Sequence, residues 1–190
     1  MMEIQTDLIV DAKGLACPMP IVKTKKGMNE LQAGQVMEVH ATDKGSTADI
    51  KAWAESGGHQ YIGTVEADGV LKHFLRRASG EENGEKKHPH VVSNDELQSI
   101  LQNNEEMVLL DVREQAEYAF NHIPNAKSFP LENFEKNVTE LNPAHTFYII
   151  CRTGNRSDVV AQKLTEAGFV HVFNVVPGMS EWTGTTAGLE

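Results

Sequence analysis

The stretch Phe147-Tyr148-Ile149-Ile150-Cys151-Arg152-Thr153-Gly154-Asn155-Arg156-Ser157 predicts a β-strand, a short loop and the start of a helix. Four apolar residues lead directly into the cysteine, and a loop containing one glycine precedes a helical pattern at residues 157–167. Loop N–H groups and the positive end of a helix dipole both stabilise a thiolate placed between them. The stretch therefore predicts an α/β fold with Cys151 as a nucleophile.

The rest of the second half of the chain alternates apolar strands with helices. Strands are expected at residues 107–112, about 127–129, 146–150 and 170–175, and helices at 94–103, 114–120, 131–140 and 157–167. Ser93 is expected to cap the first of these helices. Continuous apolar strands between helices are typical of a mostly parallel sheet that helices flank on both faces.

Residues 79–90 are rich in Gly, Pro and charge, which is typical of a flexible linker. They separate an expected first domain at residues 1–78 from an expected second domain at residues 91–190. His88 and His90 flank a proline in this stretch and are interpreted as linker residues rather than metal ligands.

The first domain is expected to have the order βαβαββ. Its strands are predicted at about residues 5–10, 35–41, 60–66 and 70–77, and its helices at 18–31 and 46–57. Pro18 and Pro20 suit a first helical turn, and Ser46 or Thr47 can cap the second helix. Asp68-Gly69 predicts a hairpin turn. Two helices on one face of a four-stranded sheet make a two-layer α/β sandwich.

The formal net charge of −10 is concentrated in the second domain, where residues 91–190 contain 6 Lys+Arg and 14 Asp+Glu. This acidity argues against a nucleic-acid partner and favours a protein or a small ligand in a local positive pocket. The acidic N-terminus and the lack of an apolar run of about 18 residues predict a cytoplasmic protein with no membrane partner. In that compartment two cysteines are expected to be working thiols.

The spacing between Cys151 and Arg156 constrains what the loop can bind. In phosphatases and arsenate reductases five residues separate the cysteine from the arginine, and the loop encircles an oxyanion. Four residues separate them here. The ring of N–H groups is therefore expected to be too tight for a phosphate and suited to a sulfur atom attached to the cysteine.

Residues 91–190 resemble a single-domain rhodanese, through residues 110–114, 117–118, 122–126, 151–157 and 176–182. The resemblance implies that the Cys151 thiolate takes an outer sulfur from a donor and becomes a persulfide. It implies that the loop residues bind the donor and the persulfide: Arg152, Thr153, Gly154, Asn155, Arg156 and Ser157. Asp111 and Arg113 are expected to support the loop and the strand end.

Two positions depart from that family, in which Gly is more common where this chain has Asn121 and Asn125. Asparagine tolerates a positive φ better than other residues with a side chain. We therefore expect both turns to be preserved.

The first domain resembles the TusA-type sulfur carriers, through residues 11–20, 41–46 and 49–53. The specific element is Cys17-Pro18-Met19-Pro20, and by resemblance Cys17 carries a persulfide between proteins. A thiol at a helix start is expected to have its thiolate favoured by the free N–H groups. Asp43 and Asp49 could tune this thiol, but turn formation and helix capping are the favoured interpretation of both.

Together the two resemblances imply a sulfurtransferase that relays sulfur between Cys151 and Cys17, in either direction, through covalent persulfides and without a metal or other cofactor. The donor could be thiosulfate, a glutathione or coenzyme A persulfide, or a partner protein. The final acceptor, the pathway and the oligomeric state stay open. The alternatives are a thiol redox sensor, a non-catalytic persulfide carrier and, with less support, a phosphatase or arsenate reductase.

Overall fold

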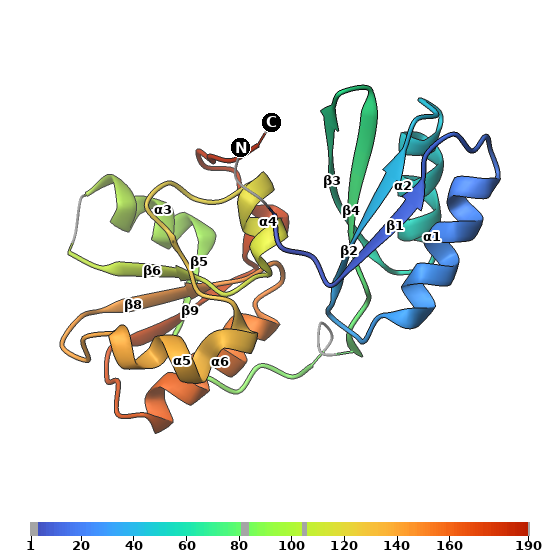
Figure 1. Cartoon of the computed structure of the whole chain (residues 1–190). Coiled ribbons are helices and arrows are strands. Elements are labelled where there is room, and N and C mark those ends of the chain that lie inside the picture. The colour runs from blue at the N-terminus through green and yellow to red at the C-terminus, as the bar shows by residue number, and fades with distance from the viewer. Residues whose placement is uncertain (1–3, 81–83, 104–105, 190) are drawn as a thin grey trace. The chain divides into compact units, whose positions relative to one another are not determined.

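The computed structural model describes residues 4–80, 84–103 and 106–189. The chain divides at Gly80 into two compact units, drawn in Figure 1, which are described separately below. The division lies inside the stretch 79–90 that was expected to be a linker. Within the described ranges, no helix is both long enough and apolar enough to cross a membrane.

The first unit has the expected order βαβαββ. Its elements are β1 (Leu8–Ala12), α1 (Met19–Glu30), β2 (Val36–Ala41), α2 (Ser46–Ser56), β3 (Gln60–Ala67) and β4 (Val70–Arg76). The sheet order is β1-β2-β4-β3, with β1 and β2 parallel and the other pairs antiparallel. Figure 1 shows both helices on the same face of this sheet, so the two-layer sandwich is confirmed.

Close approach of α1 to the sheet gives this unit its core. A Cβ on Gly27 of α1 would lie 2.7 Å from Cγ2 of Val10 in β1, which leaves room only for a glycine. Met37 of β2 and Ile50 of α2 are fully buried in the same cluster. Burial of these apolar side chains on one face holds both helices against the sheet.

The start of α1 agrees in part with the sequence prediction, whereas the predicted cap of α2 was wrong. Pro20 lies in the first turn of α1, as predicted, whereas Pro18, also expected in that turn, is the N-cap. For α2 the prediction of a Ser46 or Thr47 cap was wrong, because the N-cap is Gly45 and makes no side-chain cap. The Ser46 hydroxyl instead donates to the Asp43 carbonyl oxygen at 2.6 Å.

The second unit contains a five-stranded sheet in the order β5-β9-β8-β6-β7, and all four of its strand pairs are parallel. Its strands are β5 (Val91–Ser93), β6 (Val108–Asp111), β7 (Lys127–Ser128), β8 (Phe147–Ile150) and β9 (Val172–Val176). Its helices are α3 (Asn94–Gln102), α4 (Gln115–Phe120), α5 (Phe134–Asn137) and α6 (Asn155–Glu166). The predicted class, a parallel sheet flanked by helices, is confirmed.

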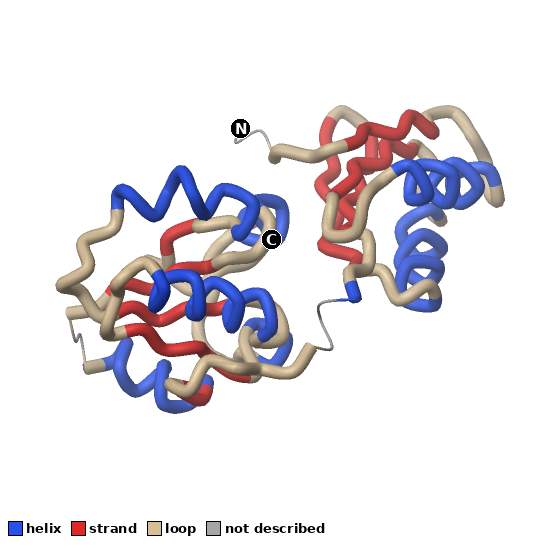
Figure 2. The backbone as a smooth tube through the Cα atoms, turned by 90° about the horizontal axis from the view of Figure 1, so that it is seen from below, coloured by secondary structure: helices blue, strands red, loops and turns tan. Residues whose placement is uncertain are grey.

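Each face of this sheet has its own apolar cluster. Val160 and Leu164 of α6 pack with Ile149 on one face, and Leu97 of α3 packs with Ile150 on the other. Figure 2 shows the strands of this unit, in red, between helices on two sides. Neighbouring residues of β8 point to opposite faces of the sheet. Because helices cover both faces, this strand is buried along its whole length.

Several local predictions in the second unit differ from the structure. The three-residue strand β5 was not predicted, α6 begins two residues early at Asn155, and the helix expected at 131–140 is a four-residue α5 between two 3₁₀ turns (Leu131–Asn133 and Val138–Glu140). A further 3₁₀ turn spans Met179–Glu181. Asn125 has the expected positive φ of 68°, whereas Asn121 has an extended φ of −161°.

The end of the expected linker also differs from the prediction. The backbone N–H of His88 donates to the Asp158 carboxylate at 2.9 Å, and the His88 side chain is only 5 % exposed. Nε2 of His88 lies 2.8 Å from the Val172 carbonyl oxygen. Residues 87–88 are therefore part of the second unit, because its helix α6 holds them in place.

A buried histidine makes the first unit sensitive to acid. His73 of β4 is fully buried, and its Nε2 lies 3.0 Å from Ser46 Oγ. Since the Ser46 proton goes to the Asp43 carbonyl, Ser46 accepts from Nε2–H, which leaves Nδ1 to accept from Thr64 at 2.9 Å. Burial lowers the pKa of His73 from 6.5 to about 4.

We predict that the free energy of unfolding of the first unit falls between pH 6.5 and pH 4, because unfolded His73 binds a proton there and folded His73 does not. The expected loss from His73 is about 2 kcal/mol between pH 7 and pH 5. Urea unfolding, followed by Trp53 fluorescence in a Trp182→Phe background, measures it. His73→Gln should lose less stability over this interval, and an equal loss in both proteins would contradict the prediction.

Candidate active site

Cys151 directly follows β8, and its sulfur faces polar hydrogen-bond donors although the residue has no exposed surface. The backbone N–H of Gly154 donates to Cys151 Sγ at 3.1 Å, and Ser157 Oγ lies 3.3 Å from the same atom. Gly154 has a φ of 87°, a left-handed conformation that turns the chain back toward the sulfur before α6 begins. Residues 151–157, called the Cys151 loop below, thus surround Sγ with donors.

Asn174 of β9 controls the orientation of the Ser157 hydroxyl. Ser157 Oγ lies 2.6 Å from Asn174 Oδ1, and Asn174 Nδ2 donates to the Gly154 carbonyl oxygen at 3.0 Å. A hydroxyl has one proton to donate, so at any moment Ser157 gives it either to Asn174 Oδ1 or to Cys151 Sγ. The sequence prediction missed Asn174, although a lone asparagine inside an apolar strand is the signal that could have found it.

Arg156, one of the loop residues expected to bind the donor and the persulfide, is buried and paired with a carboxylate. Its guanidinium forms two hydrogen bonds to the Glu117 carboxylate, at 2.7 and 3.0 Å, and both side chains are buried. Burial lowers the pKa of Arg156, but the negative charges of Glu117, Cys151 and Glu114 outweigh burial and raise the pKa above its ordinary value. The arginine is thus always charged, and Glu117, which the sequence prediction did not assign to the site, neutralises it.

The remaining members of the Cys151 loop are held by the chain that follows β9. The Cys151 and Arg152 carbonyls accept from the backbone N–H groups of Met179 and Ser180 at 2.8 and 2.9 Å. A Cβ on Gly178 would lie 2.4 Å from the Cys151 carbonyl oxygen, so this close approach requires glycine. Thr153 is half-buried and Asn155 is buried in the first turn of α6. The loop backbone is therefore fixed on both sides.

Asp111 and Arg113, the two expected supporting residues, contact each other. The Asp111 carboxylate accepts from Arg113 Nη2 at 2.6 Å and from Arg113 Nε at 2.9 Å, and Nη2 also donates to the Asn121 carbonyl oxygen. Both side chains are buried. Glu117 and Arg156 influence the pKa of Arg113 through their charges, which places this pair beside the Arg156–Glu117 pair.

Cys17 lies in an electrostatic setting opposite to the one expected. It is exposed, and it directly precedes Pro18, the N-cap of α1. A hydrogen bond to Asp49 raises the pKa of Cys17 above the ordinary value. Partial loss of solvent around the thiol and the charge of Asp43 act in the same direction. This direction is opposite to the expectation that the helix start favours the thiolate, because two nearby carboxylates disfavour a negative charge on the sulfur. Asp43 also accepts from the Gly45 N–H, so it has the turn role too.

The two units define a class of protein that carries one cysteine on a small α/β sandwich and another in a loop of a parallel α/β domain. The family model "Sulfurtransferase TusA" matches residues 8–77, and the model "Rhodanese-like domain" matches residues 93–185. The chain belongs to the family of sulfur carrier proteins in which a TusA domain is followed by a rhodanese-like domain.

One relative is similar over almost the whole chain. The "Putative sulfur carrier protein YrkF" of Bacillus subtilis (strain 168) is 48% identical over 183 residues, covering 96% of this chain and 99% of the relative. A second protein of that strain, "Putative sulfur carrier protein YrkI", is 53% identical over 74 residues, 39% of this chain and 99% of its own length.

Among solved structures, the rhodanese-like domain of the Alr3790 protein from Anabaena sp. is similar to this chain, with a TM-score of 0.50 and 25% identity. The similarity covers 52% of this chain and 79% of that one. It supports the assignment of the parallel α/β fold.

We predict that Glu117→Gln destabilises the second unit by about 3 kcal/mol, because it removes the buried carboxylate that neutralises Arg156 and leaves only the partly exposed Glu114, at 3.7 Å, to balance that charge. Urea unfolding, followed by Trp182 fluorescence in a Trp53→Phe background, measures the change. Glu135→Gln is the matched control, since it breaks the exposed pair with Lys163 and should cost less than about 1 kcal/mol. Equal effects of the two variants would contradict the buried-pair argument.

We predict that Asp49→Asn makes Cys17 react severalfold faster with iodoacetamide at neutral pH. The substitution removes the carboxylate that contributes most to the raised pKa of Cys17, so more thiolate is present. Rates are measured in a Cys151→Ser background, where Cys17 is the sole thiol. Asp68→Asn, in the β3–β4 turn, is the control and should leave the rate unchanged. A slower reaction in Asp49→Asn would contradict the prediction.

Proposed function

We propose that this protein is a sulfurtransferase in which Cys151 takes up sulfane sulfur as a persulfide and Cys17 receives it for delivery to an acceptor protein in the cytoplasm. The observation that carries the proposal is the Cys151 Sγ atom with the Gly154 N–H at 3.1 Å and the Ser157 hydroxyl at 3.3 Å. The proposed transfer uses the two cysteines alone, without a metal or an organic cofactor.

The proposed chemistry consists of two displacements on sulfur. The Cys151 thiolate attacks the outer sulfur of the donor, a bond forms between the two sulfurs, and the donor leaves as sulfite from thiosulfate or as a thiolate from an organic persulfide. The Cys17 thiolate then attacks the outer sulfur of the Cys151 persulfide, and the Cys151 thiolate leaves. One sulfur atom passes along the chain, and the two steps need no outside oxidant or reductant.

Hydrogen bonds to its sulfur distinguish Cys151 from an inert, buried structural cysteine. A structural cysteine in a core has apolar neighbours and no need of donors. Here Gly154 and Ser157 place polar hydrogens at the sulfur, where they stabilise a negative charge on Sγ or on an attached sulfur. Because Sγ is not exposed, a donor reaches it when side chains above the loop move aside.

The different surroundings of the two thiols favour transfer from Cys151 to Cys17. A persulfide releases its outer sulfur more readily when its inner sulfur leaves as a stabilised thiolate. The donors at Cys151 stabilise that leaving thiolate, whereas Asp49 and Asp43 raise the pKa of Cys17 and make it a poorer leaving group. The less stabilised thiolate of Cys17 is also the stronger intrinsic nucleophile.

Linkage within one chain makes this transfer efficient in our proposal. Eight residues separate Ala78, whose backbone N–H binds His59 in the first unit, from Lys87, whose backbone N–H binds Asp158 in the second. A fully extended chain of that length spans about 28 Å. A tether of this kind raises the effective concentration of one thiol near the other to about the millimolar range.

We predict that a persulfide formed on Cys151 moves to Cys17 faster within the chain than between chains. The protein is mixed with one equivalent of thiosulfate, quenched with an alkylating agent, and the 32 Da adduct is assigned to Cys151 or Cys17 by peptide mass spectrometry. The expected result is an adduct on Cys151 first and on Cys17 later, at a rate independent of protein concentration.

The control is a mixture of Cys17→Ser and Cys151→Ser, in which transfer occurs only between chains and its rate depends on protein concentration. Equal rates in the mixture and in the intact chain would contradict the tether. A disulfide between the two cysteines without any adduct would favour a redox sensor. An adduct on Cys151 that never leaves would favour a non-catalytic carrier, and phosphate-ester hydrolysis lost in Cys151→Ala would favour a phosphatase.

A further inference from the structure

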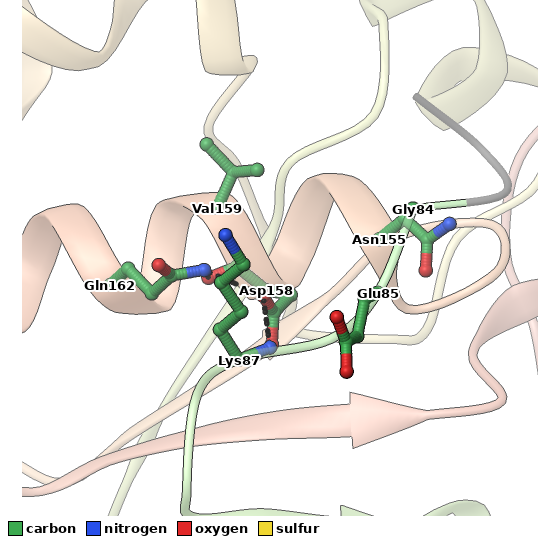
Figure 3. Close-up of a pocket in the computed structure, with 7 residues that line it drawn as sticks. All are labelled: Gly84, Glu85, Lys87, Asn155, Asp158, Val159 and Gln162. Atoms are coloured by element: carbon green, nitrogen blue, oxygen red, sulfur yellow. Dashed lines mark hydrogen bonds between the residues drawn. The ribbon is translucent and has the colours of Figure 1, made fainter. Parts of the chain in front are cut away.

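The segment at residues 84–88 lies against the first turns of α6, next to the Cys151 loop. The backbone N–H of Lys87 donates to both oxygens of Asp158, at 3.0 and 3.1 Å, and Gln162 Nε2 donates to the same carboxylate at 2.6 Å. Figure 3 shows these groups converging on Asp158. With the further bond from the His88 N–H, the carboxylate holds this segment at a fixed position on the helix.

Two neighbouring lysines of this segment have different surroundings. The Lys87 side chain lines a hollow of about 250 Å³ between the segment and α6, together with Asn155, Val159 and Gln162 (Figure 3). Lys86 instead lies against the Cys151 loop, because its Cε is 2.9 Å from the point that a Cβ on Gly154 would occupy. The two side chains carry the same charge and differ in what they contact.

Gly154 is close to both Lys86 and the reactive sulfur. The Gly154 N–H is the donor to Cys151 Sγ, and the absence of a side chain on Gly154 is what lets Lys86 lie over the loop. The ammonium group is one bond beyond Cε. It therefore adds a positive charge beside Gly154, the residue whose N–H donates to Sγ.

The charge of Lys86 adds to that of Arg152, the partly exposed cation within the Cys151 loop. Glu117 neutralises Arg156, and residues 91–190 carry an excess of acidic side chains that repels anions. The donors considered for this site, thiosulfate and organic persulfides, are anions. A lysine from the preceding segment offsets the local repulsion without a change in the loop itself.

We propose that Lys86 recruits anionic sulfur donors to Cys151, and that Asp158 positions it by holding the backbone of residues 87–88. The inference rests on the proposed role of Cys151 in sulfur transfer. Lys86 acts on the encounter with the donor, so it changes KM for thiosulfate and leaves the chemical step at Cys151 unchanged.

Two alkylating agents of almost the same size test this proposal independently of sulfur transfer. Iodoacetate is an anion and iodoacetamide is neutral, so the ratio of their rates at Cys151 reports the electrostatic potential at the sulfur. In a Cys17→Ser background, Lys86→Gln should lower this ratio on the order of fivefold, as expected for one unit charge near a protein surface. The effect should shrink as the salt concentration rises.

Lys87→Gln is the matched control, because it removes the same charge one residue away and keeps the backbone bond to Asp158. Lys87→Gln should change the ratio of the two alkylation rates much less. Lys86→Arg, which keeps the positive charge, should give the same ratio as the protein with Lys86. Steady-state kinetics with thiosulfate should show a raised KM and an unchanged kcat in Lys86→Gln.

Equal effects of Lys86→Gln and Lys87→Gln, or an unchanged ratio in Lys86→Gln, would overturn the role of Lys86. If the protein forms no persulfide from thiosulfate, the proposed function fails, while the alkylation ratio still decides whether Lys86 attracts anions to Cys151.

Discussion

The buried ion pair between Arg156 and Glu117 determines the chemistry that is open to the Cys151 loop. Both side chains are at most 3 % exposed, and two hydrogen bonds fix the guanidinium on the carboxylate. A charge buried this deeply needs its partner, so a turn of Arg156 toward a ligand would cost it both hydrogen bonds to Glu117. An oxyanion in the loop would therefore lack the bidentate arginine that usually recognises such groups.

Because Arg156 is paired with Glu117, the hydrogen bonds to Cys151 Sγ come from the Gly154 N–H and the Ser157 hydroxyl. Such donors suit one atom of modest negative charge better than a phosphate with charge on several oxygens. The sequence argument from the four-residue spacing reached the same preference through ring size alone. The pairing of Arg156 with Glu117, a residue outside the loop and 39 positions before it, is consistent with that expectation.

Residue patterns predicted the elements that depend on local periodicity, and they missed what depends on distant partners. The order βαβαββ, the parallel sheet and the Ser93 cap follow from apolar spacing and capping chemistry within short windows. The strand β5 has three residues and no apolar alternation, and it forms because β9 offers an unpaired edge. Asn174 and Asp158 act through contacts with residues far away in the sequence, which spacing alone does not show.

The composition of residues 79–90 suggests a boundary at residue 91, yet the second unit extends further back. The linker prediction rests on the polar and charged side chains of residues 79–90. The hydrogen bonds of Lys87 and His88 to Asp158 instead use backbone N–H groups, which composition does not distinguish. Asp158 collects these bonds beside the Cys151 loop. A domain cut at residue 91 would keep the sheet and the nucleophile but would lack both Lys86 and the connection to the sulfur carrier. Residues 84–88 thus contain the lysine that we propose recruits the donor, and they also connect the second unit to the first.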